Sequence, residues 1–559
     1  MVKELESSCW WGKAGTKMLG LLGTLAGTKM LGLLGTLILT TSVGCTGSTL
    51  ESDSESLPGQ AVYGYSCAPC HGPEGDGQGP AAYLVFPKPR NFQRGDFKLR
   101  TTAMGQLPTD EDLVRTVTEG IPGSSMFSFA GVLSETEIEA VVEYVKLLTP
   151  KFADATPVTQ DQLLQIPDQP ASTPELVAAG RQVYELMRCA QCHGPEGRGD
   201  GPSAPTLRDS EGDPFPAADF TFGIYKGGRR PQDLYRTFLT GMAGTPMPSY
   251  ASALQSDEQA WTLVYYVLSL APGGEPPPTR SDPGPLSAAS LAGTAALTDP
   301  WSPDWEDVAP HRVALRPLWY RNDYPTSATL RAVRDGDQLA LLVEWRDSSQ
   351  NTEALRTQSF SDAVALQFAL VDPPPFVGMG QAGPGGEVEI WYWRADRQTA
   401  SDEGQPAELT SVYPDLDVDR YPFAVGDDPL DDNLPAADEL PRDQEPPYVT
   451  ARDVGNPVSD PDLMTQPVHG LAAAGYGSLT SRPADQMRAA GKGSWRDGVY
   501  RVLFTAPAAP TTPEIKADFT LASVPLAVAI WDGAAGDRNG TKLVSQWLML
   551  ESGPRRQNR

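Results

Sequence analysis

Apolar residues recur with the period of an α-helix in two segments of the chain. Each segment opens with a helix-capping sequence, Ser134-x-x-Glu137 in the first and Ser256-x-x-Gln259 in the second. Apolar side chains then follow at helical spacing and would form one face of each helix. These faces comprise Ile138, Val141, Val142, Val145 and Leu148 in the first segment, and Trp261, Val264, Val267 and Leu268 in the second. The pattern predicts two equivalent amphipathic helices.

Each of these helices follows a predicted upstream helix and a stretch of shared sequence. The upstream helices carry Gly59, Val62 and Tyr63 in one copy, and Gly180, Val183 and Tyr184 in the other. GQAVYGYSCAPCHGPEGDGQGP aligns with GRQVYELMRCAQCHGPEGRGDGP, and EDLVRTVTEGIPGSSM aligns with QDLYRTFLTGMAGTPM. The chain therefore contains an internal repeat, and we expect two all-α domains over residues 56–150 and 175–272.

From about residue 291 the helical period gives way to the alternation typical of strands. Residues 329–333, the turn Asp335-Gly336-Asp337 and residues 338–345 predict a β-hairpin. Further strands are expected at 362–371, 388–393, 499–505, 526–531 and 543–550. The segment 291–559 is therefore expected to be an all-β domain, an antiparallel sandwich.

Composition marks the connections between these domains. Proline-rich segments at 149–174 and 271–290 would link the three domains. Residues from about 397 to 470 turn to Asp, Pro and Glu with little period, which predicts a long surface insertion in the β domain.

The formal charge is −27, from 71 acidic and 44 basic residues. Nucleic-acid binding needs a basic surface, so this charge argues against that class of partner. An acidic surface suits docking to a cationic redox partner, and general solvation explains it equally well.

Residues 1–45 are expected to be an export leader. The sequence GTKMLGLLGTL occurs at 15–25 and again at 27–37, and Lys29 interrupts the apolar run, which argues against a simple membrane span. Gly44 then precedes Cys45. This ending resembles a bacterial lipoprotein signal, which implies a lipid on Cys45, although Ser42 replaces the usual leucine. A plain cleaved signal and an uncleaved membrane helix are the alternatives.

The candidate chemistry lies in Cys67-Ala68-Pro69-Cys70-His71 and Cys189-Ala190-Gln191-Cys192-His193. C-x-x-C-H is the attachment signature of c-type haem: the thiols add to the haem vinyl groups and the histidine becomes the proximal iron ligand. A four-cysteine zinc site or a dithiol redox centre is the alternative, but neither explains the adjacent histidines. The two runs predict two covalent haems c, bound by Cys67, Cys70, Cys189 and Cys192, with His71 and His193 on the irons.

The repeat also selects the distal iron ligands. Met126 and Met247 occupy equivalent places in the two copies, whereas Met104, Met187 and Met242 have no methionine counterpart. The sequence predicts His/Met ligation, which is that of electron-carrying cytochromes c. The alternative is a pair of ordinary core or surface methionines.

The helix order around each motif resembles the class I cytochrome c fold over about 56–150 and 175–272. The first methionine loop departs from that pattern, because Ser125 and Phe127 flank Met126 where prolines flank Met247. Haem attachment in bacterial cytochromes c takes place outside the cytoplasm, so the resemblance implies a periplasmic or cell-surface protein.

Four strand segments carry a second resemblance: FSDAVALQFAL, PPPFVGMGQAGPGGEVEIWYWRAD, GSWRDGVYRVLFTAP and VPLAVAIWDGAAGDRNGTKLVSQW. They resemble the haem-b-binding domain of gamma subunits of ethylbenzene dehydrogenase and related molybdenum enzymes of the dimethyl sulfoxide reductase family. That family holds a non-covalent haem b by methionine and lysine, which implies Met379 and Lys542 as iron ligands here. Lys492 is the fallback, and His311 and His469 are substitutes.

These features together predict an anchored electron-transfer protein with two haems c and one haem b. It would be a gamma-like partner of the catalytic and iron–sulfur subunits of a molybdenum oxidoreductase acting on nitrite or nitrate, chlorate, selenate or a hydrocarbon. It would exchange electrons with a soluble or membrane carrier. A dihaem peroxidase or nitrite-converting enzyme, and a dihaem cytochrome whose sandwich binds carbohydrate or another partner, are the alternatives.

Overall fold

The computed structural model describes residues 57–271, 280–290, 298–415 and 461–551, apart from positions 372, 377, 384, 406, 408, 515 and 516. All described residues belong to one unit, Ser56–Arg559. The predicted leader with Cys45 lies outside the described residues, as do 416–460 of the predicted insertion. Within the described ranges, no helix has both the length and the apolar character to cross a membrane.

The first helical domain contains the helices that the repeat predicts. Its elements are α1 (Gln60–Ser66), α2 (Ala68–His71), α3 (Asp110–Glu119), α4 (Glu135–Leu147) and the short 3-10 helices η1 (Ala82–Leu84), η2 (Phe92–Arg94), η3 (Pro150–Phe152) and η4 (Gln160–Gln162). Ser134 caps α4 in a complete capping box with Glu137. The apolar face of α4 is buried against α1 and α3, as its period predicts.

The second helical domain repeats this order of elements. It comprises α5 (Pro174–Leu186), α6 (Ala190–His193), α7 (Pro231–Thr240), α8 (Asp257–Ser269), η5 (Ala204–Thr206) and η6 (Phe220–Phe222). Ser256 caps α8 by accepting from the Gln259 amide, but the Gln259 side chain accepts from Gln255 rather than closing the expected capping box. Trp261, Val264 and Val267 are buried, as expected.

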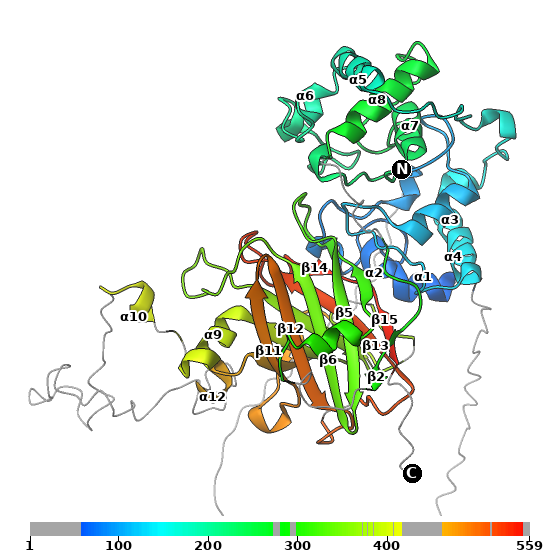
Figure 1. Ribbon diagram of the computed structural model, residues 1–559. Coiled ribbons are helices and arrows are strands. Elements are labelled where there is room, and N and C mark those ends of the chain that lie inside the picture. Colours follow the sequence, from blue (N-terminus) through cyan, green and yellow to red (C-terminus); the bar gives the residue numbers. More distant parts are fainter. Residues whose placement is uncertain are drawn as a thin grey trace, which may run out of the picture. The chain divides into compact units, whose positions relative to one another are not determined.

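A glycine allows the two long helices of the second domain to cross closely. α5 packs on α8 (Figure 1). A β-carbon added at Gly180 would lie 1.9 Å from the Thr262 carbonyl oxygen, a distance that no side chain can occupy. The equivalent Gly59 approaches the Ala140 carbonyl of α4 in the same way. Both repeats therefore use a glycine at the helix crossing that encloses the candidate site.

The C-terminal region is built from two sheets. The larger has the order β1-β15-β13-β7-β8-β9-β10 with β14 and β4 attached, and the smaller has the order β11-β12-β6-β5-β2 with β3 attached to β5. Figure 1 shows β5, β6, β12 and β11 side by side. The strands are β1 (Leu286–Ser287), β2 (Ala289–Ser290), β3 (His311–Ala314), β4 (Arg316–Pro317), β5 (Ser327–Asp335), β6 (Gln338–Arg346), β7 (Ala363–Ala369), β8 (Val388–Arg394), β9 (Val468–Ala473), β10 (Thr480–Ser481), β11 (Ala490–Arg496), β12 (Val499–Pro507), β13 (Ser523–Trp531), β14 (Leu543–Val544) and β15 (Leu548–Glu551).

Both sheets contribute to one hydrophobic core. The cluster contains Leu330, Val343 and Val502 from the smaller sheet together with Leu366 and Val528 from the larger one. The predicted hairpin is formed by β5 and β6, with Asp335 paired to Gln338. Most pairs are antiparallel, as expected; the exceptions are the edge pairs β1 with β15 and β2 with β5, which are parallel.

The ends of the predicted insertion differ from expectation. Residues Ala395–Glu403 form helix α9, and Arg397, Gln398 and Ala400 of this helix are buried. β9 pairs with β8 inside the larger sheet. Residues 468–470, the end of the predicted insertion, therefore belong to a strand of the sheet. The small side chains of the VHGLAA sequence give only a weak strand pattern. The described part of the insertion also includes the short helices α10 (Leu409–Val412) and α12 (Pro461–Met464). Outside the insertion, the domain contains the 3-10 helices η8 (Pro303–Asp307) and η11 (Ala484–Gln486).

Candidate haem-binding sites

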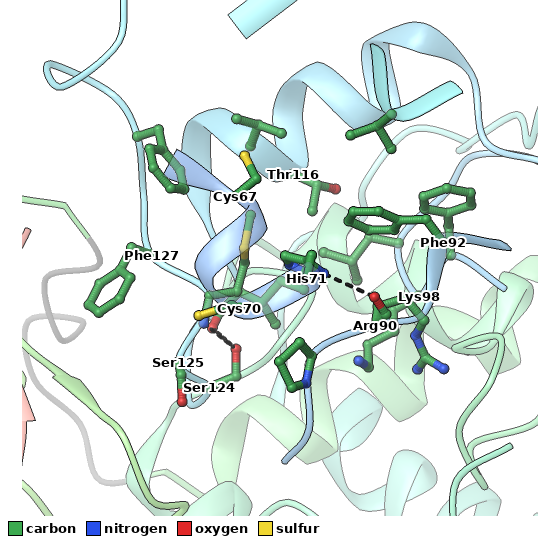
Figure 2. A pocket seen from close by; sticks show the side chains of 18 of the residues that line it. Cys67, Cys70, His71, Arg90, Phe92, Lys98, Thr116, Ser124, Ser125 and Phe127 are labelled. Atoms are coloured by element: carbon green, nitrogen blue, oxygen red, sulfur yellow. Dashed lines mark hydrogen bonds between the residues drawn. The ribbon is translucent and has the colours of Figure 1, made fainter. Parts of the chain in front are cut away.

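The first C-x-x-C-H motif forms one side of an apolar cavity. Its residues form the short helix α2, in which the His71 amide donates to the Cys67 carbonyl at 2.8 Å. This turn points Cys67, Cys70 and His71 into the same space (Figure 2). Met126, from the loop between α3 and α4, lines the same cavity. The structure therefore brings together all four residues that are predicted to bind the first haem.

The His71 ring is held by a hydrogen bond and by an aromatic neighbour. Nδ1 lies 2.9 Å from the Arg90 carbonyl oxygen, which can only accept, so Nδ1 carries the proton. The ring also stacks on Phe92, with centroids 4.4 Å apart. Burial lowers the pKa of His71 to about 4, so the imidazole is neutral at physiological pH and Nε2 has a free lone pair. This is the state in which a histidine binds iron.

The second motif has the same geometry. Nδ1 of His193 donates to the Ala218 carbonyl at 3.0 Å, and the ring stacks on Phe220 at 4.3 Å. Burial lowers the pKa of His193 to about 4. Four residues of the predicted site line one cavity: Cys189, Cys192, His193 and Met247. The repeat in sequence is thus also a repeat of the site.

The loops that carry the predicted distal methionines are also equivalent. In each loop the backbone amide five residues before the methionine donates to the methionine carbonyl: Ile121 to Met126 at 3.0 Å, and Met242 to Met247 at 3.1 Å. Gly120 begins the first loop with a φ of 68°, and a β-carbon there would lie 2.4 Å from the Phe127 carbonyl carbon. Only glycine fits this turn without displacing the backbone next to Met126.

The other methionines of the helical domains take different positions. Met104 is exposed, and its sulfur accepts from Arg100 at 2.8 Å. Met187 packs against the core of the second domain. Met242 also lines the second cavity, beside Met247, so the structure adds it as a neighbour of the predicted ligand.

The cavities suit a large apolar group attached through sulfur. Burial raises the pKa of the thiols of Cys67 and Cys70 to about 12, so both are protonated and unreactive as thiolates at neutral pH. Apolar side chains, including Leu113, Val141 and Phe129, form much of the first wall. An apolar tetrapyrrole that consumes both thiols as thioethers would fit this lining better than a zinc ion, which binds thiolates.

The predicted haem b ligands approach the outer face of the larger sheet. This alanine-rich face is defined by Ala363, Ala365, Ala369, Ala527 and Ala529. Met379 packs against the same cluster, and the Lys542 ammonium lies 4.8 Å from the centre of the Trp531 ring, which also belongs to it. Four of these alanines, Ala363, Ala365, Ala369 and Ala527, are buried.

Two observations distinguish the alternative ligands at this face. Burial lowers the pKa of Lys542 to about 8. The neutral amine, which iron ligation requires, is therefore easier to form than at an exposed lysine. Lys492, in contrast, is exposed on β11. His469 lies on β9 with Leu471 on the same face, and its buried Nε2 has no hydrogen-bond partner among the described residues. His311 lies on β3 of the other sheet.

Three lysines line the haem-type cavities, and the sequence patterns singled out none of them; Lys88, in the first cavity, donates to the Ala82 carbonyl at 2.9 Å. Lys98 lines the first cavity, and Lys226 lines both cavities. The signal for them was present in the repeat, because NFQRGDFK of the first copy aligns with DFTFGIYK of the second. Phe215 of the second domain also lines both cavities.

Three family models match the chain and define its class. Residues 55–145 match cytochrome c oxidase, cbb3-type, subunit III, and residues 177–271 match cytochrome c. Residues 302–543 match the model described as ethylbenzene dehydrogenase. The chain therefore joins two cytochrome c domains, which imply covalent haem, to a domain resembling the gamma subunits of ethylbenzene dehydrogenase and related enzymes.

Individual relatives agree with this class. The chain is 28% identical over 225 residues to the cbb3-type cytochrome c oxidase subunit CcoP of Azospirillum sp., covering 38% of this chain and 62% of that protein. It is 23% identical over 241 residues to the dimethylsulfide dehydrogenase subunit gamma of Rhodovulum sulfidophilum, covering 42% and 65%. The chain thus matches less than two thirds of the length of either relative.

Among solved structures, a chain of the reducing HAO-like protein complex of Kuenenia stuttgartiensis is 44% identical. The match covers 38% of this chain and 96% of that chain, with a TM-score of 0.37. The family models and the curated relatives together support a role in haem-based electron transfer.

Proposed function

We propose that the protein is an extracytoplasmic electron carrier that holds two haems c and one haem b. The repeated cavity carries this proposal. In each copy a C-x-x-C-H turn, a histidine oriented by a backbone carbonyl and a methionine meet in one apolar space. His/Met ligation is typical of cytochromes that carry electrons, because the thioether raises the potential of the iron.

The residues of each site have distinct roles in this proposal. Cys67 and Cys70 hold the first haem by thioether bonds, and Cys189 and Cys192 hold the second. His71 and His193 are the proximal ligands, and Met126 and Met247 the distal ones. The bound haem supplies a reversible one-electron change at iron. The chain fixes the ligands and keeps water away, which lowers the reorganisation that each electron transfer requires.

The C-terminal domain is proposed to be a sandwich that binds haem b at its alanine-rich face. Met379 and Lys542 are the iron ligands. The approach of both residues to the cluster around Trp531 supports this assignment. So does the lowered pKa of Lys542, because only the neutral amine can donate its lone pair to iron.

The contacts between the domains support a relay among the three haems. Phe376, just upstream of Met379, lines the first haem c cavity. The Phe86 amide donates to the Leu318 carbonyl at 2.9 Å, so the first cytochrome domain and the β domain share a backbone contact. Phe215 lines both haem c cavities. Electrons would pass between haem b and the second haem c through the first haem c.

The proposed partner is a molybdenum oxidoreductase. The C-terminal domain would dock on its catalytic and iron–sulfur subunits as a gamma-like subunit, and the cytochrome domains would exchange electrons with a soluble or membrane carrier. The match of residues 302–543 and the resemblance to the dimethylsulfide dehydrogenase gamma subunit support this partner. The substrate of that enzyme is a nitrogen or chlorine oxyanion, selenate or a hydrocarbon.

The proposed domain boundaries are 56–150, 175–272 and 291–559. The proposed location is the periplasm or cell surface, with a lipid on Cys45 after removal of the leader. The placement of covalent haem attachment outside the cytoplasm supports the compartment. Mass spectrometry of the mature N-terminus tests the anchor.

The test of the whole proposal is the haem content per chain. A pyridine haemochrome spectrum of the purified protein, taken before and after acid-acetone extraction, counts covalent and extractable haem separately. The expected result is two unextractable haems c and one extractable haem b. Two haems c alone would overturn the haem b assignment and remove Met379 and Lys542 from the site, and fewer than two would overturn the ligand set of the repeat.

A further inference from the structure

We infer that Lys98 and Lys226 form a shared cationic site that binds the carboxylate side chains of the two haems c. The inference rests on the proposed function, because the anionic ligand is part of the proposed haems. It adds a role that neither the attachment motif nor the axial ligands require. The lysines would anchor the polar edge of each haem opposite its covalent bonds to cysteine.

The first observation is that the two lysines are equivalent. They occupy the same place in the repeat, after the phenylalanines that stack on His71 and His193. Each lines the cavity of its own domain. Lysine at a matching position of two otherwise apolar cavities indicates a common ligand rather than a coincidence of surface charge.

The second observation is that neither charge is directly paired within the part of the chain that the structure describes, although the Asp209 carboxylate attracts Lys98. Lys226 is only 8% exposed, and Lys98 is partly buried. Among the contacts between described residues, neither ammonium has an ion pair or a hydrogen bond. A buried charge without a partner is costly, so buried lysines are normally paired. An anion that enters the cavity would remove this cost.

The third observation is that the two ammonium groups share one aromatic neighbour. Each lies 5.7 Å from the centre of the Phe215 ring. Figure 2 shows Lys98 beside Arg90, whose guanidinium lines the same cavity but donates to the Gly244 carbonyl and to Ser210. Three cationic side chains therefore meet where the cavities adjoin, and burial, followed by repulsion from Arg90 and Lys226, lowers the pKa of Lys98.

The chemistry of the ligand follows from this charge. A c-type haem is apolar except for its iron and its two propionates. The cavity walls are mostly apolar, and Lys98 and Lys226 are among their few charged side chains. The propionates are therefore the groups that match the unpaired ammoniums. Lys226 lines both cavities, so it would contact the propionates of both haems, whereas Lys98 lines only the first.

The experiment compares redox potentials of charge-removing variants in the full-length protein. Lys98→Met, Lys226→Met and the control Lys151→Met are titrated by spectroelectrochemistry across a pH series, after haem content has been counted in each. Lys151 is an exposed lysine of the same domain, with its ammonium 3.9 Å from Asp96, so the control removes the same charge from the surface. Lys98→Arg and Lys226→Arg keep the charge.

The expected result is specific to each variant. Loss of a cation beside a haem disfavours the added electron, so the potential falls. Lys98→Met should lower one potential, Lys226→Met should lower both, and Lys151→Met should change neither. The unpaired propionates should also titrate at higher pH, so the pH at which the potential begins to fall should rise. The arginine variants should restore both readouts.

Wild-type potentials and wild-type pH profiles in both methionine variants, with both haems c attached, would overturn the inference. Absence of covalent haem from the unaltered protein would instead overturn the proposed function. Should a methionine variant not fold, the corresponding Lys→Gln variant is measured by the same two readouts. A response that appears only when inorganic phosphate is varied would show that the lysines bind a solvent anion, and would also overturn the inference.

Discussion

The fold fixes the orientation and the protonation state of each predicted proximal histidine. The carbonyl of Arg90 or Ala218 fixes the tautomer, and Phe92 or Phe220 fixes the ring plane. Burial keeps the ring neutral, since charging it would require a proton in an apolar cavity. A histidine held in this way loses little conformational freedom when it binds iron.

Met247→Ala tests the distal ligand of the second haem. Removal of the thioether should abolish the methionine-to-iron charge-transfer band of that haem, so about half of the total band intensity should remain, from Met126. The measurement is near-infrared absorption of the oxidised protein. Met242→Leu is the matched control, because Met242 lines the same cavity and should leave the band intact.

An unchanged band in Met247→Ala, or a lost band in Met242→Leu, would contradict the assignment. The result also bears on the enzymatic alternative, because a peroxidase needs an open or displaceable sixth position on iron. A methionine bound to each iron would make that chemistry unfavourable at both sites.

The residues of the site differ in how far the sequence predicted them. The cysteines, histidines and methionines were found because covalent attachment and the repeat fix their spacing. Lys98 and Lys226 were missed because a lysine is usually a surface residue, and only the fold reveals that Lys226 is buried, that Lys98 is partly buried and that neither has an ion pair among the described residues. Phe215 was missed because its contact with the first cavity comes from the packing of two domains.

At the scale of elements, the crossing of α5 and α8 depends on Gly180. Gly180→Ala places a methyl group against the Thr262 carbonyl, so the helices must separate and the cavity between them must distort. Overpacking of this kind costs about 1–3 kcal/mol. We expect the free energy of unfolding of the second domain to fall by that amount in urea denaturation followed by circular dichroism.

Gly64→Ala is the control for this substitution. Gly64 lies inside α1, and a β-carbon there would meet nothing within 4 Å. Alanine is the better helix former by about 0.5–1 kcal/mol, so this variant should be slightly more stable than the natural protein. Equal destabilisation by the two substitutions would show that the crossing is not the cause.

Three strand ends bring acidic residues together in the β domain. Asp347 follows β6, Asp362 precedes β7 and Asp532 follows β13, and their oxygens lie within 4.8 Å of one another. Burial, followed by repulsion from Asp362, raises the pKa of Asp347 from 3.8 to about 7. In this pH range the folded state binds more protons than the unfolded state, so Asp347 makes stability fall as pH rises from about 4 to about 7.

Asp347→Asn removes this penalty while keeping an oxygen that can accept from the Ser349 amide. The free energy of unfolding of the variant should equal that of the natural protein at a pH of about 4. Above a pH of about 7 it should be larger, by at most about 4 kcal/mol. Urea unfolding at both pH values, with a chelator present, measures the difference. Asp337→Asn, in the exposed β5–β6 turn, should show no such pH dependence, and an equal gain in both variants would contradict the role of burial.

Strand prediction succeeded where apolar side chains are dense and failed where glycine replaces them. β5 and β12 alternate in part between buried and less buried positions, and β6, β7 and β8 are buried along most of their length. β11 was missed because Gly491 and Gly493 interrupt the pattern, yet they are needed: a β-carbon at Gly493 would meet the Trp393 ring at 2.1 Å. The expected strand at 543–550 is two strands, β14 and β15. These features depend on neighbours far away in sequence, which local patterns do not contain.

At the scale of the whole molecule, the domains share more than a linker. The Ser125 hydroxyl donates to the Leu318 carbonyl, and Tyr320 donates from its side chain to the Ala217 carbonyl. One short segment of the β domain thus contacts both cytochrome domains. These contacts join side-chain hydroxyls to backbone carbonyls of residues far away in the chain, which local sequence patterns do not reveal. A shared contact segment suits a relay, because electron transfer slows steeply with distance.

The charge of the molecule predicts the kind of carrier that it meets. With 71 acidic and 44 basic residues, it should attract a basic carrier over distances of about 10 Å at 0.1 M salt. Electrostatic steering of this kind raises association rates by about 10- to 1,000-fold at low salt. We expect stopped-flow oxidation of the reduced protein by a basic c-type cytochrome to slow markedly as ionic strength rises. An acidic carrier should show the opposite trend, because screening then relieves repulsion. Equal salt dependence for both carriers would mean that the acidic surface serves solvation rather than docking.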